Sequence, residues 1–528
     1  MLFRSKEADI SIPDVGLTQM VLAPGAAPRE KPALIDGATG RSLTYGQLAH
    51  DVRRVAAALH ARGFRKGDVF AIFSPNVPEY AVAFHAVSLL GGVCTTINPS
   101  YTAGEVSHQL RDANAVFLLT VPALTDGALE AVQGTSVREL FVLGDAEGAE
   151  GAEGATPFAA LLESENEPPP VEIDAAEDLV ALPYSSGTTG LPKGVMLTHR
   201  NLVANLLQIE TCRLILPDDV VLCVLPLYHI YGLSVIMNLG LYTGATIVVM
   251  PRFDLEDFLR IMQDYRVTLA PIVPPLILAL SKHPLVEAYD LSSLRLIFSG
   301  AAPLSQALTS ACAERTGCIV RQGYGMTETS PATHLSPNDP AEIKPGSVGP
   351  CVPGTECKII DTESGVLLGA GREGEICVRG PQVMKGYLNR PEATRATIDA
   401  EGWLHTGDVG YVDEDGHLFI VDRVKELIKY KGLQVAPAEL EALLLAHPSV
   451  ADAAVIPSPD EEAGEVPKAF VVLRGEANAE ELMAFVAGRV APHKKIRKLE
   501  FIEQIPKSAS GKILRRVLVE RERLSRQE

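Results

Sequence analysis

Helix-like and strand-like segments alternate along most of this sequence, and this alternation limits its folds more than any other feature. An apolar, strand-like run at 68–74 is followed by a helical pattern at 77–90, and the same order continues over 93–121. The alternation returns over 255–322. Short apolar strands separated by helices predict an α/β fold of mostly parallel sheets covered by helices.

The length of the chain and a change in its texture predict at least two domains. A chain of 528 residues exceeds what a single hydrophobic core usually serves. After Gly346, short strands separated by glycine and proline continue to about Val421, which indicates a β-rich subdomain. The remaining residues have their own α/β pattern, with helices expected at 437–446 and 480–490 and strands at 451–456, 469–473 and 499–502. We therefore predict a large N-terminal domain, 1–421, and a small C-terminal domain, 422–528.

Charge and hydropathy argue against several classes of partner. The 66 acidic and 47 basic side chains give a formal charge of −19, which repels nucleic acids and anionic membranes. The uncharged run Val220–Pro251 is long enough to span a bilayer, but proline and glycine interrupt it, so we expect buried core segments instead.

The two ends of the sequence and its cysteines predict that the protein is cytoplasmic. The N-terminus lacks an apolar signal segment, and the last three residues do not form a peroxisomal signal. The eight cysteines lack the spacing of zinc ligands, so we expect reduced thiols.

The strongest chemical signal is the segment Tyr184–Gly194, with the sequence YSSGTTGLPKG, directly after a strand-like run at 179–182. Small residues allow backbone N–H groups to close around phosphate oxygens, hydroxyl groups add donors, and a lysine adds positive charge. The spacing is not that of a Walker A loop. The candidate phosphate-binding residues are Ser185, Ser186, Gly187, Thr188, Thr189 and Lys193.

Two other motif-like segments do not indicate function, and one catalytic motif is missing. Gly369–Gly374 matches G-x-G-x-x-G, but a strand is expected after it where a dinucleotide site needs a helix. His229–Gly232 faintly resembles a signature of tRNA synthetases, yet the acidic charge argues against that class. No G-x-S-x-G segment supports a serine acyl-enzyme.

Five motifs, in order, resemble the adenylate-forming superfamily of acyl-CoA synthetases, luciferases and peptide-synthetase adenylation domains. They are Tyr184–Gly194, Gln322–Glu328 (QGYGMTE), Thr406–Asp408 (TGD), Asp422–Gln434 (DRVKELIKYKGLQ) and Pro506–Lys512 (PKSASGK). The resemblance extends from about Leu43 to Arg516. It implies an enzyme that uses ATP and Mg²⁺ to activate a carboxylic acid as its acyl-adenylate.

The resemblance also implies roles for individual residues. Glu328 would hold Mg²⁺, Thr327 would contact the α-phosphate, and Asp408 would hold the ribose hydroxyls, with Arg423 nearby. Lys512 would bridge the acid carboxylate and the α-phosphate, and His229 is a further catalytic candidate. Further nucleotide contacts would come from Gln322, Gly323, Tyr324, Lys425, Lys429 and Gln434.

Within the superfamily, Glu426–Glu441 and Pro226–Tyr231 most resemble the 4-coumarate–CoA ligases. The resemblance implies coenzyme A as second substrate, with Arg252, Lys431 and Gly432 on its path and no carrier protein. It also implies a mobile C-terminal domain that swings about a hinge at Asp422. The acid pocket would be lined by His229, Ile230, Tyr231, Val235, Ala301, Gly323 and Pro331. An apolar Val235 stands where the plant enzymes usually carry a small polar residue, which predicts weak discrimination between 4-coumarate and cinnamate.

The acid itself is left open by these motifs, because fatty-acyl ligases and luciferases share them. A medium-chain fatty acyl-CoA ligase is the alternative to an enzyme for cinnamate-type acids. A luciferase-like oxygenase is more distant, because luciferases are specialised descendants of ligases. A non-catalytic acyl-adenylate binder is also more distant, since Lys193, Glu328, Asp408 and Lys512 are all present.

Overall fold

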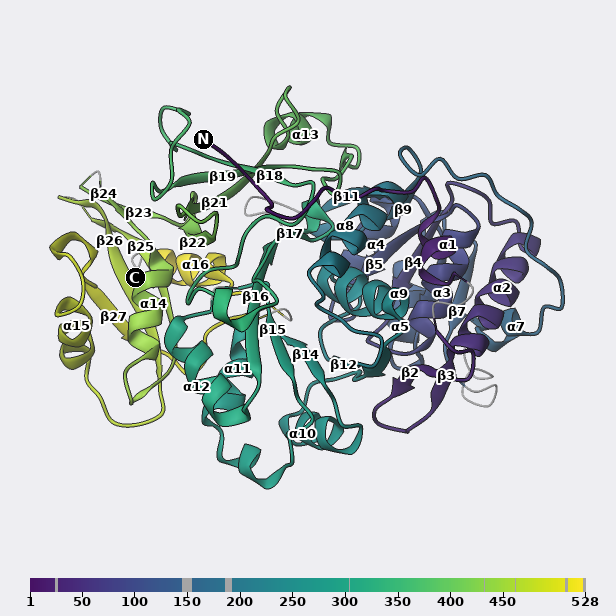
Figure 1. Ribbon diagram of the computed structural model, residues 1–528, viewed down its shortest axis with the longest axis horizontal. Helices are drawn as coiled ribbons and strands as arrows, with labels where there is room; N and C mark the ends of the chain where they lie inside the picture. The colour runs from purple at the N-terminus through teal and green to yellow at the C-terminus, as the bar shows by residue number, and fades with distance from the viewer. Residues whose placement is uncertain are drawn as a thin grey trace.

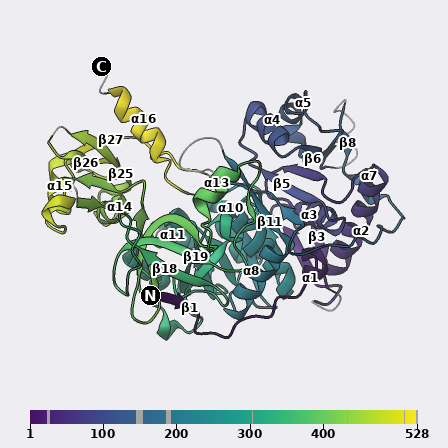
Figure 2. The same cartoon turned by 90° about the horizontal axis from the view of Figure 1, so that it is seen from above.

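The computed structural model describes residues 1–23, 27–144, 154–185, 192–302, 304–431, 433–460, 462–508 and 511–525. Two large α/β layers, an antiparallel sheet and a small C-terminal α/β unit lie side by side (Figure 1). Seen from above, the C-terminal elements occupy one end of the molecule (Figure 2). The predicted fold class is confirmed.

The first large sheet is parallel over most of its width. Its strands, in spatial order, are β10 (Tyr184–Ser185), β11 (Lys193–Thr198), β9 (Leu179–Ala181), β5 (Val93–Ile97), β4 (Val69–Phe73), β6 (Ala115–Thr120), β7 (Glu139–Val142) and β8 (Thr156–Pro157), with β20 (Gly386–Tyr387) beside β11. Its helices include α2 (Tyr45–Ala61), α3 (Glu79–Leu89), α4 (Ala103–Asp112), α5 (Thr125–Ala131) and α7 (Ala159–Leu162).

The second large sheet is also mainly parallel, with antiparallel strands at its two edges. In spatial order its strands are β17 (Ala332–Leu335), β16 (Ile319–Gly325), β15 (Leu296–Ser299), β14 (Leu269–Ile272), β12 (Val220–Cys223), β13 (Thr246–Val249), β2 (Pro32–Asp36) and β3 (Ser42–Thr44). Its helices include α1 (Leu17–Val21), α8 (His199–Thr211), α9 (Leu239–Thr243), α10 (Leu255–Asp264), α11 (Pro274–Lys282) and α12 (Gln306–Thr316).

The expected β-rich subdomain is an antiparallel sheet that also takes in the N-terminal strand. Its order is β1 (Leu2–Arg4), β18 (Glu356–Ile360), β19 (Gly374–Arg379), β21 (Leu404–Val412) and β22 (Leu418–Arg423), with α13 (Pro391–Thr397) alongside. The strand β19 begins at Gly374, so a strand does follow the G-x-G-x-x-G segment and the segment opens no helix.

The C-terminal unit has a five-stranded sheet and a hydrophobic core of its own. Its elements are β23 (Ile428–Tyr430), β24 (Leu433–Val435), α14 (Pro437–Leu445), β25 (Val450–Asp460), β26 (Gly464–Leu473), α15 (Ala479–Ala487), β27 (Lys498–Phe501) and α16 (Arg515–Ser525). The separate core supports a boundary near residue 421, which we retain as a proposal.

Local chemistry explains why the elements begin and end where they do. The five residues of β4 are all apolar and almost wholly buried, as expected for a strand inside a parallel sheet. Helix α8 begins after Thr198, whose hydroxyl accepts from the Asn201 N–H while the Asn201 side chain accepts from the Thr198 N–H. Helix α12 begins at Gln306, because Ser305 caps it and accepts from the Leu308 N–H.

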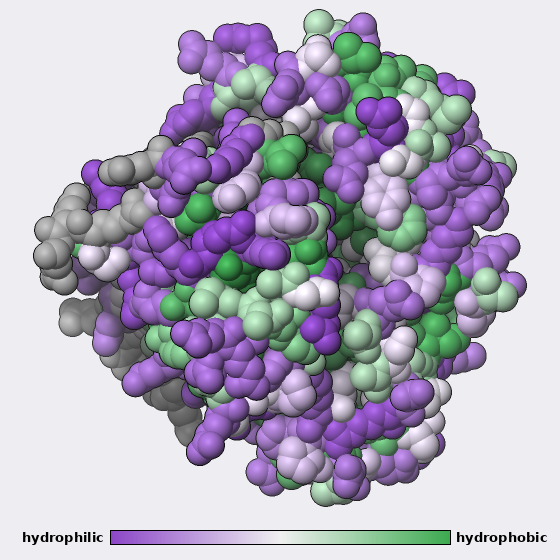
Figure 3. Space-filling view, turned by 90° about the vertical axis from the view of Figure 1, so that its left-hand side faces the viewer, coloured by the Kyte–Doolittle hydropathy of each residue, from purple (hydrophilic) through white to green (hydrophobic). Residues whose placement is uncertain are grey.

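The uncharged run Val220–Pro251 folds into several buried pieces. It contains β12, a π-helix η2 (Tyr231–Asn238), α9 and β13, and every residue of η2 is buried. No helix among the described residues is long and apolar enough to cross a membrane. Polar residues cover most of the face on which the C-terminal unit lies (Figure 3).

The strands β25 and β26 are longer than the sequence pattern suggests. The expected strands at 451–456 and 469–473 extend into one long antiparallel hairpin. Pro457 and Pro467 face each other across the hairpin, so both missing N–H groups belong to one residue pair. The backbone pairing of the two strands therefore continues beyond the prolines. Proline therefore marks no strand end here.

Acid should destabilise the protein through His199. Its Nδ1 accepts a hydrogen bond of 3.0 Å from the Leu17 N–H, and burial lowers the pKa of His199 to about 4. Since the unfolded chain binds this proton near pH 6.5 and the folded chain only near pH 4, the free energy of unfolding falls as pH falls through that window. From pH 7 to pH 5 this group alone should cost about 2 kcal/mol.

The matched variant is His199→Asn, which keeps a side-chain acceptor for Leu17 but no titrating group. Its thermal unfolding midpoint should drop less between pH 7 and pH 5 than that of the wild type. Equal drops in the two proteins would show that His199 does not carry this acid sensitivity.

Candidate active site

Glu328 joins two strands of the first sheet to the second sheet. It lies on a 3₁₀ turn, Thr327–Thr329, directly after β16, and only 6% of its surface is exposed. Its carboxylate oxygen Oε1 accepts hydrogen bonds from Ser185 Oγ at 2.9 Å and from the Tyr387 hydroxyl at 2.8 Å. The Lys193 ammonium lies 4.6 Å from the centre of the Tyr387 ring. The structure thus gathers Ser185, Lys193, Thr327 and Glu328.

The predicted phosphate loop connects two paired strands beside Glu328. Ser185 on β10 faces Lys193 on β11, so the ends of the loop are fixed by strand pairing. The predicted phosphate-binding residues Ser186, Gly187, Thr188 and Thr189 lie outside the described residues.

The donor set at Glu328 fits a hard cation such as Mg²⁺. Hard cations take oxygen ligands, and a carboxylate that phosphate groups can approach is a usual one. Both hydrogen bonds that described residues make to this carboxylate reach Oε1. The other oxygen, Oε2, is therefore the one available to an ion.

Two hydrogen bonds hold the Asp408 carboxylate. Its Oδ2 accepts from the Tyr324 hydroxyl at 2.6 Å, and its Oδ1 accepts from Arg423 Nε at 3.1 Å. Burial, and then the charge of Asp408, raise the pKa of Tyr324 far above its usual range, so Tyr324 stays a donor. Gly407, at a φ of 69°, makes the turn that presents Asp408.

Lys512 reaches this site from the C-terminal unit. Burial and the charge of Arg423 lower the pKa of Lys512, whereas the charges of Asp408 and Glu328 act in the opposite direction. The ammonium group therefore lies within electrostatic reach of both carboxylates.

Close packing between the two domains holds the Lys512 loop in place. The loop is closed by Ser508 Oγ, which accepts from the Lys512 N–H at 3.1 Å. A methyl group added at Gly511 would lie 3.3 Å from the Pro275 ring at the start of α11. A larger residue at 511 would therefore push the loop away from the N-terminal domain.

His229 is neutral in this arrangement. Burial, and then the nearby charge of Lys512, lower the pKa of His229 to about 3. The Tyr231 N–H approaches His229 Nδ1 at 3.3 Å. A neutral imidazole next to the lysine can accept a proton but does not repel the cation.

The residues predicted for the acid pocket come from four separate segments. Tyr231 and Val235 lie on η2, and the Tyr231 hydroxyl donates to the Phe298 carbonyl at 3.0 Å. A methyl group at Gly323 would lie 2.6 Å from the Phe298 ring, so β16 passes directly beside it. The remaining members are apolar; Ile230 and Pro331 are buried and Ala301 is half-buried.

A cavity lies next to His229 on the side of the first sheet. The residues that line it are Thr96, Asn98, Tyr101, Gln109, Pro183, Tyr184, Tyr228, His229, Ile230 and Thr327.

The described residues predicted to bind coenzyme A, Arg252 and Lys431, are exposed, as are Lys425 and Lys429, which were predicted to contact the nucleotide. Lys431 Nζ pairs with Glu462 at 2.6 Å and the Lys429 N–H donates to Glu465 at 2.8 Å, both within the C-terminal unit. Gly432 lies outside the described residues, and for Gln434 only the backbone, paired with Lys429, is described.

Asp422, the predicted hinge, lies within β22 and is buried. Its carboxylate accepts from its neighbour, the Arg423 N–H, at 2.8 Å and from the Ala438 N–H, in the first turn of α14, at 2.9 Å. It therefore ties the last strand of the N-terminal domain to the first helix of the C-terminal unit.

Sequence patterns missed several residues that the structure brings to the site. Tyr387 lies on a two-residue strand and reaches Glu328 only because β20 pairs with β11. No local pattern indicates that pairing. Thr96 and Asn98, by contrast, lie at the carboxyl end of a predicted strand, where α/β sheets usually bind ligands, and that rule was sufficient to find them.

Comparisons with known proteins identify the family of this chain. A model of the AMP-binding enzyme family matches residues 23–388, and a model of the AMP-binding enzyme C-terminal domain matches 439–512. A 4-coumarate–CoA ligase from Pinus taeda is 48% identical, covering 98% of this chain and 97% of the relative.

Solved structures give the same result. ATP-bound MatB from Rhodopseudomonas palustris is 32% identical, with a TM-score of 0.86 over 96% of this chain and 99% of that one. The anthranilate CoA ligase AuaEII in complex with anthranoyl-AMP is 27% identical, with a TM-score of 0.88 over 98% of this chain and 99% of that one. This chain belongs to the AMP-binding enzyme family that includes the 4-coumarate–CoA ligases.

Proposed function

We propose that this protein is an ATP-dependent ligase that joins cinnamate-type acids, 4-coumarate among them, to coenzyme A through an acyl-adenylate. One observation carries the proposal. The ammonium group of Lys512, from the C-terminal unit, lies within electrostatic reach of His229, Glu328 and Asp408 of the N-terminal domain. A cation at that point can offset the charge that develops when a carboxylate approaches a phosphate.

In the first step, an oxygen of the acid carboxylate attacks the α-phosphorus of ATP. The bond from that phosphorus to the bridging oxygen breaks, and pyrophosphate leaves. Lys512 and Thr327 would stabilise the charge on the α-phosphate, while Lys193 and Ser185 would hold the leaving phosphates. Asp408 would accept hydrogen bonds from the ribose hydroxyls. For this, its hydrogen bond from Tyr324 or from Arg423 would have to weaken or break. A Mg²⁺ ion on Glu328 would offset further phosphate charge.

In the second step, the sulfur of coenzyme A attacks the acyl carbon, the bond to the adenylate oxygen breaks, and AMP and the thioester are formed. Lys512 occupies the approach to the reacting atoms, so we propose that the C-terminal domain swings about Asp422 between the steps. That motion would bring Lys431, Gly432 and Arg252 to the coenzyme. Because the charge of Lys512 is one cause of the low pKa of His229, its departure would raise that pKa and make the imidazole a better acceptor for the thiol proton.

The proposed acid class follows from the lining of the pocket. Tyr231, the backbone at Gly323 and the apolar side chains of Ile230, Val235 and Pro331 offer a flat, apolar surface. The 4-coumarate–CoA ligase from Pinus taeda shares 48% of its sequence with this chain. The eight free cysteines fit a reducing compartment, and we propose the cytoplasm.

Val235 should set the preference between 4-coumarate and cinnamate. Its side chain is buried on η2 and offers no hydrogen bond to a ring hydroxyl. Val235→Ser should raise the kcat/KM ratio of 4-coumarate to cinnamate about two- to tenfold, the worth of one net hydrogen bond. Val235→Ala is the matched control, because it opens the same space without a hydroxyl. If both variants shifted the ratio equally, the effect would be one of volume, and Val235 would not control hydroxyl recognition.

The two-step scheme is tested by separating the half-reactions. With 4-coumarate, ATP and Mg²⁺ but no coenzyme A, the protein should release pyrophosphate in an amount close to the enzyme concentration. Addition of coenzyme A should then give 4-coumaroyl-CoA and AMP in equal amounts. Formation of ADP and phosphate in place of AMP and pyrophosphate would overturn the scheme.

A further inference from the structure

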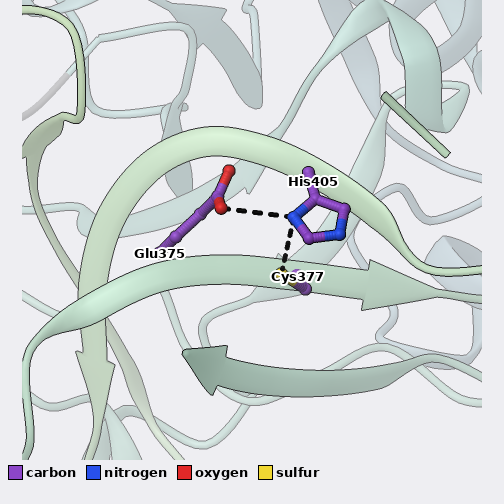
Figure 4. A group of neighbouring side chains, drawn as sticks. All are labelled: Glu375, Cys377 and His405. Atoms are coloured by element: carbon purple, nitrogen blue, oxygen red, sulfur yellow. Dashed lines mark hydrogen bonds and ion pairs between the residues drawn. The ribbon is translucent and has the colours of Figure 1, made fainter. Parts of the chain in front are cut away.

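Metal-type ligands gather at a second place, on the antiparallel sheet away from Glu328. Glu375 and Cys377 are two residues apart on β19, so their side chains point to the same face, and His405 lies on the neighbouring strand β21. Cys377 and His405 are directly paired across the two strands. Figure 4 shows the three side chains turned toward one another. Among the described residues, they are the one group of three whose possible ligand atoms all lie within 4.8 Å of each other.

The distances are those of a tetrahedral metal site. His405 Nδ1 lies 3.2 Å from Glu375 Oε2 and 3.6 Å from Cys377 Sγ. Bonds of about 2.0–2.1 Å to nitrogen and oxygen and about 2.3 Å to sulfur give tetrahedral edges of about 3.3 Å between N and O and about 3.6 Å between N and S. The third pair of ligand atoms, on Glu375 and Cys377, lies within 4.8 Å, so all three atoms are within reach of a single ion.

A further carboxylate faces the other nitrogen of the imidazole. Asp399 Oδ2 lies 3.6 Å from His405 Nε2. The Asp399 side chain is itself fixed, because its Oδ1 accepts from the Glu401 and Trp403 N–H groups at 2.9 Å each. With a metal bound at Nδ1, the remaining proton of His405 would lie on Nε2 and face Asp399, an arrangement common behind metal-bound histidines.

The cluster is buried on one side and exposed to solvent on the other. Cys377 is the fully buried member. The side chains of His405 and Glu375 are 30% and 19% exposed and face the solvent side. An ion can reach the cluster from water, and a water molecule can complete its coordination.

We propose that Glu375, Cys377 and His405 bind a divalent transition metal of the zinc class, with water as the fourth ligand. Thiolate and imidazole ligands select such ions over Mg²⁺ or Ca²⁺. The thiol proton is released to solvent on binding. The site is distinct from the Mg²⁺ site proposed at Glu328 and does not depend on the proposed reaction.

The ion would brace the turn that presents Asp408. Pairing between β19 and β21 is interrupted between Glu375 and Cys377, and the extra residues of β21 form the turn Thr406–Asp408. Glu375 Oε1 accepts from the Gly407 N–H at 3.1 Å, and Thr406 Oγ1 donates to the Ile376 carbonyl at 2.7 Å. An ion held by Glu375 Oε2 and His405 would fix both ends of this turn.

Cobalt(II) is the probe, because a thiolate bound to it absorbs in the near ultraviolet. The full-length protein is stripped with a chelator, desalted and titrated with Co²⁺. One equivalent should produce the thiolate band, and one equivalent of Zn²⁺ should remove it. Cys377→Ala and His405→Gln should each abolish the band. Asp399→Asn, which keeps the acceptor for Glu401 and Trp403, should weaken binding about 10- to 100-fold.

Cys351→Ala is the matched control. Cys351 is a second buried thiol beside an imidazole, with Sγ 3.3 Å from His334 Nε2. This variant should keep the band and the wild-type affinity. A wild type without a band at one equivalent, or an unchanged band in His405→Gln, would overturn the proposal. Because His405 is partly exposed, His405→Gln decides the matter even if Cys377→Ala fails to fold.

Discussion

Replacing Lys512 with alanine should slow acyl-adenylate formation about 10²–10³-fold, the usual cost of losing one preorganised charge contact at a transition state. Thioester formation from a supplied acyl-adenylate and coenzyme A should stay within a few-fold of wild type. In the proposed reaction Lys512 would lie where the carboxylate and the α-phosphate meet, and the charges of Glu328 and Asp408 act on it in this structure. The measurements are pyrophosphate release for the first step and acyl-CoA formation for the second.

Lys507→Ala is the control for this experiment. Lys507 lies five positions earlier in the same loop, but its ammonium pairs with Asp452 of the C-terminal unit at 2.6 Å. Adenylation by this variant should therefore be close to normal. Near-normal pyrophosphate release from Lys512→Ala itself would remove Lys512 from the reacting centre.

Proline at Asp422 should separate the two half-reactions. It fixes φ at the proposed hinge, and a C-terminal domain held in one orientation would misplace either Lys512 or Lys431. Misplacement of a catalytic group by about 1 Å can cost about 10²-fold in rate. We therefore expect one half-reaction of Asp422→Pro to fall about 10²-fold more than the other.

Asp422→Ala is the necessary comparison, because proline also removes the carboxylate that binds the Ala438 N–H. Alanine removes the same contact and leaves φ free. The difference between the two variants therefore reflects the fixed dihedral angle together with the lost backbone N–H. Equal losses in both half-reactions for Asp422→Pro, with the same pattern in Asp422→Ala, would place the hinge elsewhere.

Much of the fold could be predicted because its strands and helices carry strong local patterns. The apolar run of β4 and the capped start of α8 can be recognised without any tertiary information. The π-helix η2 could not be predicted, because all of its residues are buried and packing decides which backbone hydrogen bonds they form. The length of β25 and β26 was hidden by Pro457 and Pro467, which face each other.

The candidate site shows the same division between local and long-range information. The motifs identified Glu328, Asp408 and Lys512, and the structure brings these three into one electrostatic environment. Motifs could not show that Tyr387 and Ser185 hold Glu328, since β20 and β10 are too short to recognise. Nor could they pair Cys377 with His405, because that contact depends on the register of β19 and β21. The roles of individual residues are predictions, which the Lys512, Asp422 and Val235 variants test.

The most direct test of the proposed ligase activity is the specificity constant for thioester formation over a set of acids. Purified protein with ATP, Mg²⁺ and coenzyme A would be assayed with 4-coumarate, cinnamate, benzoate, malonate and octanoate. We expect kcat/KM for 4-coumarate and for cinnamate to exceed that for octanoate. A higher value for octanoate than for both would contradict the account and favour a medium-chain fatty acyl-CoA ligase.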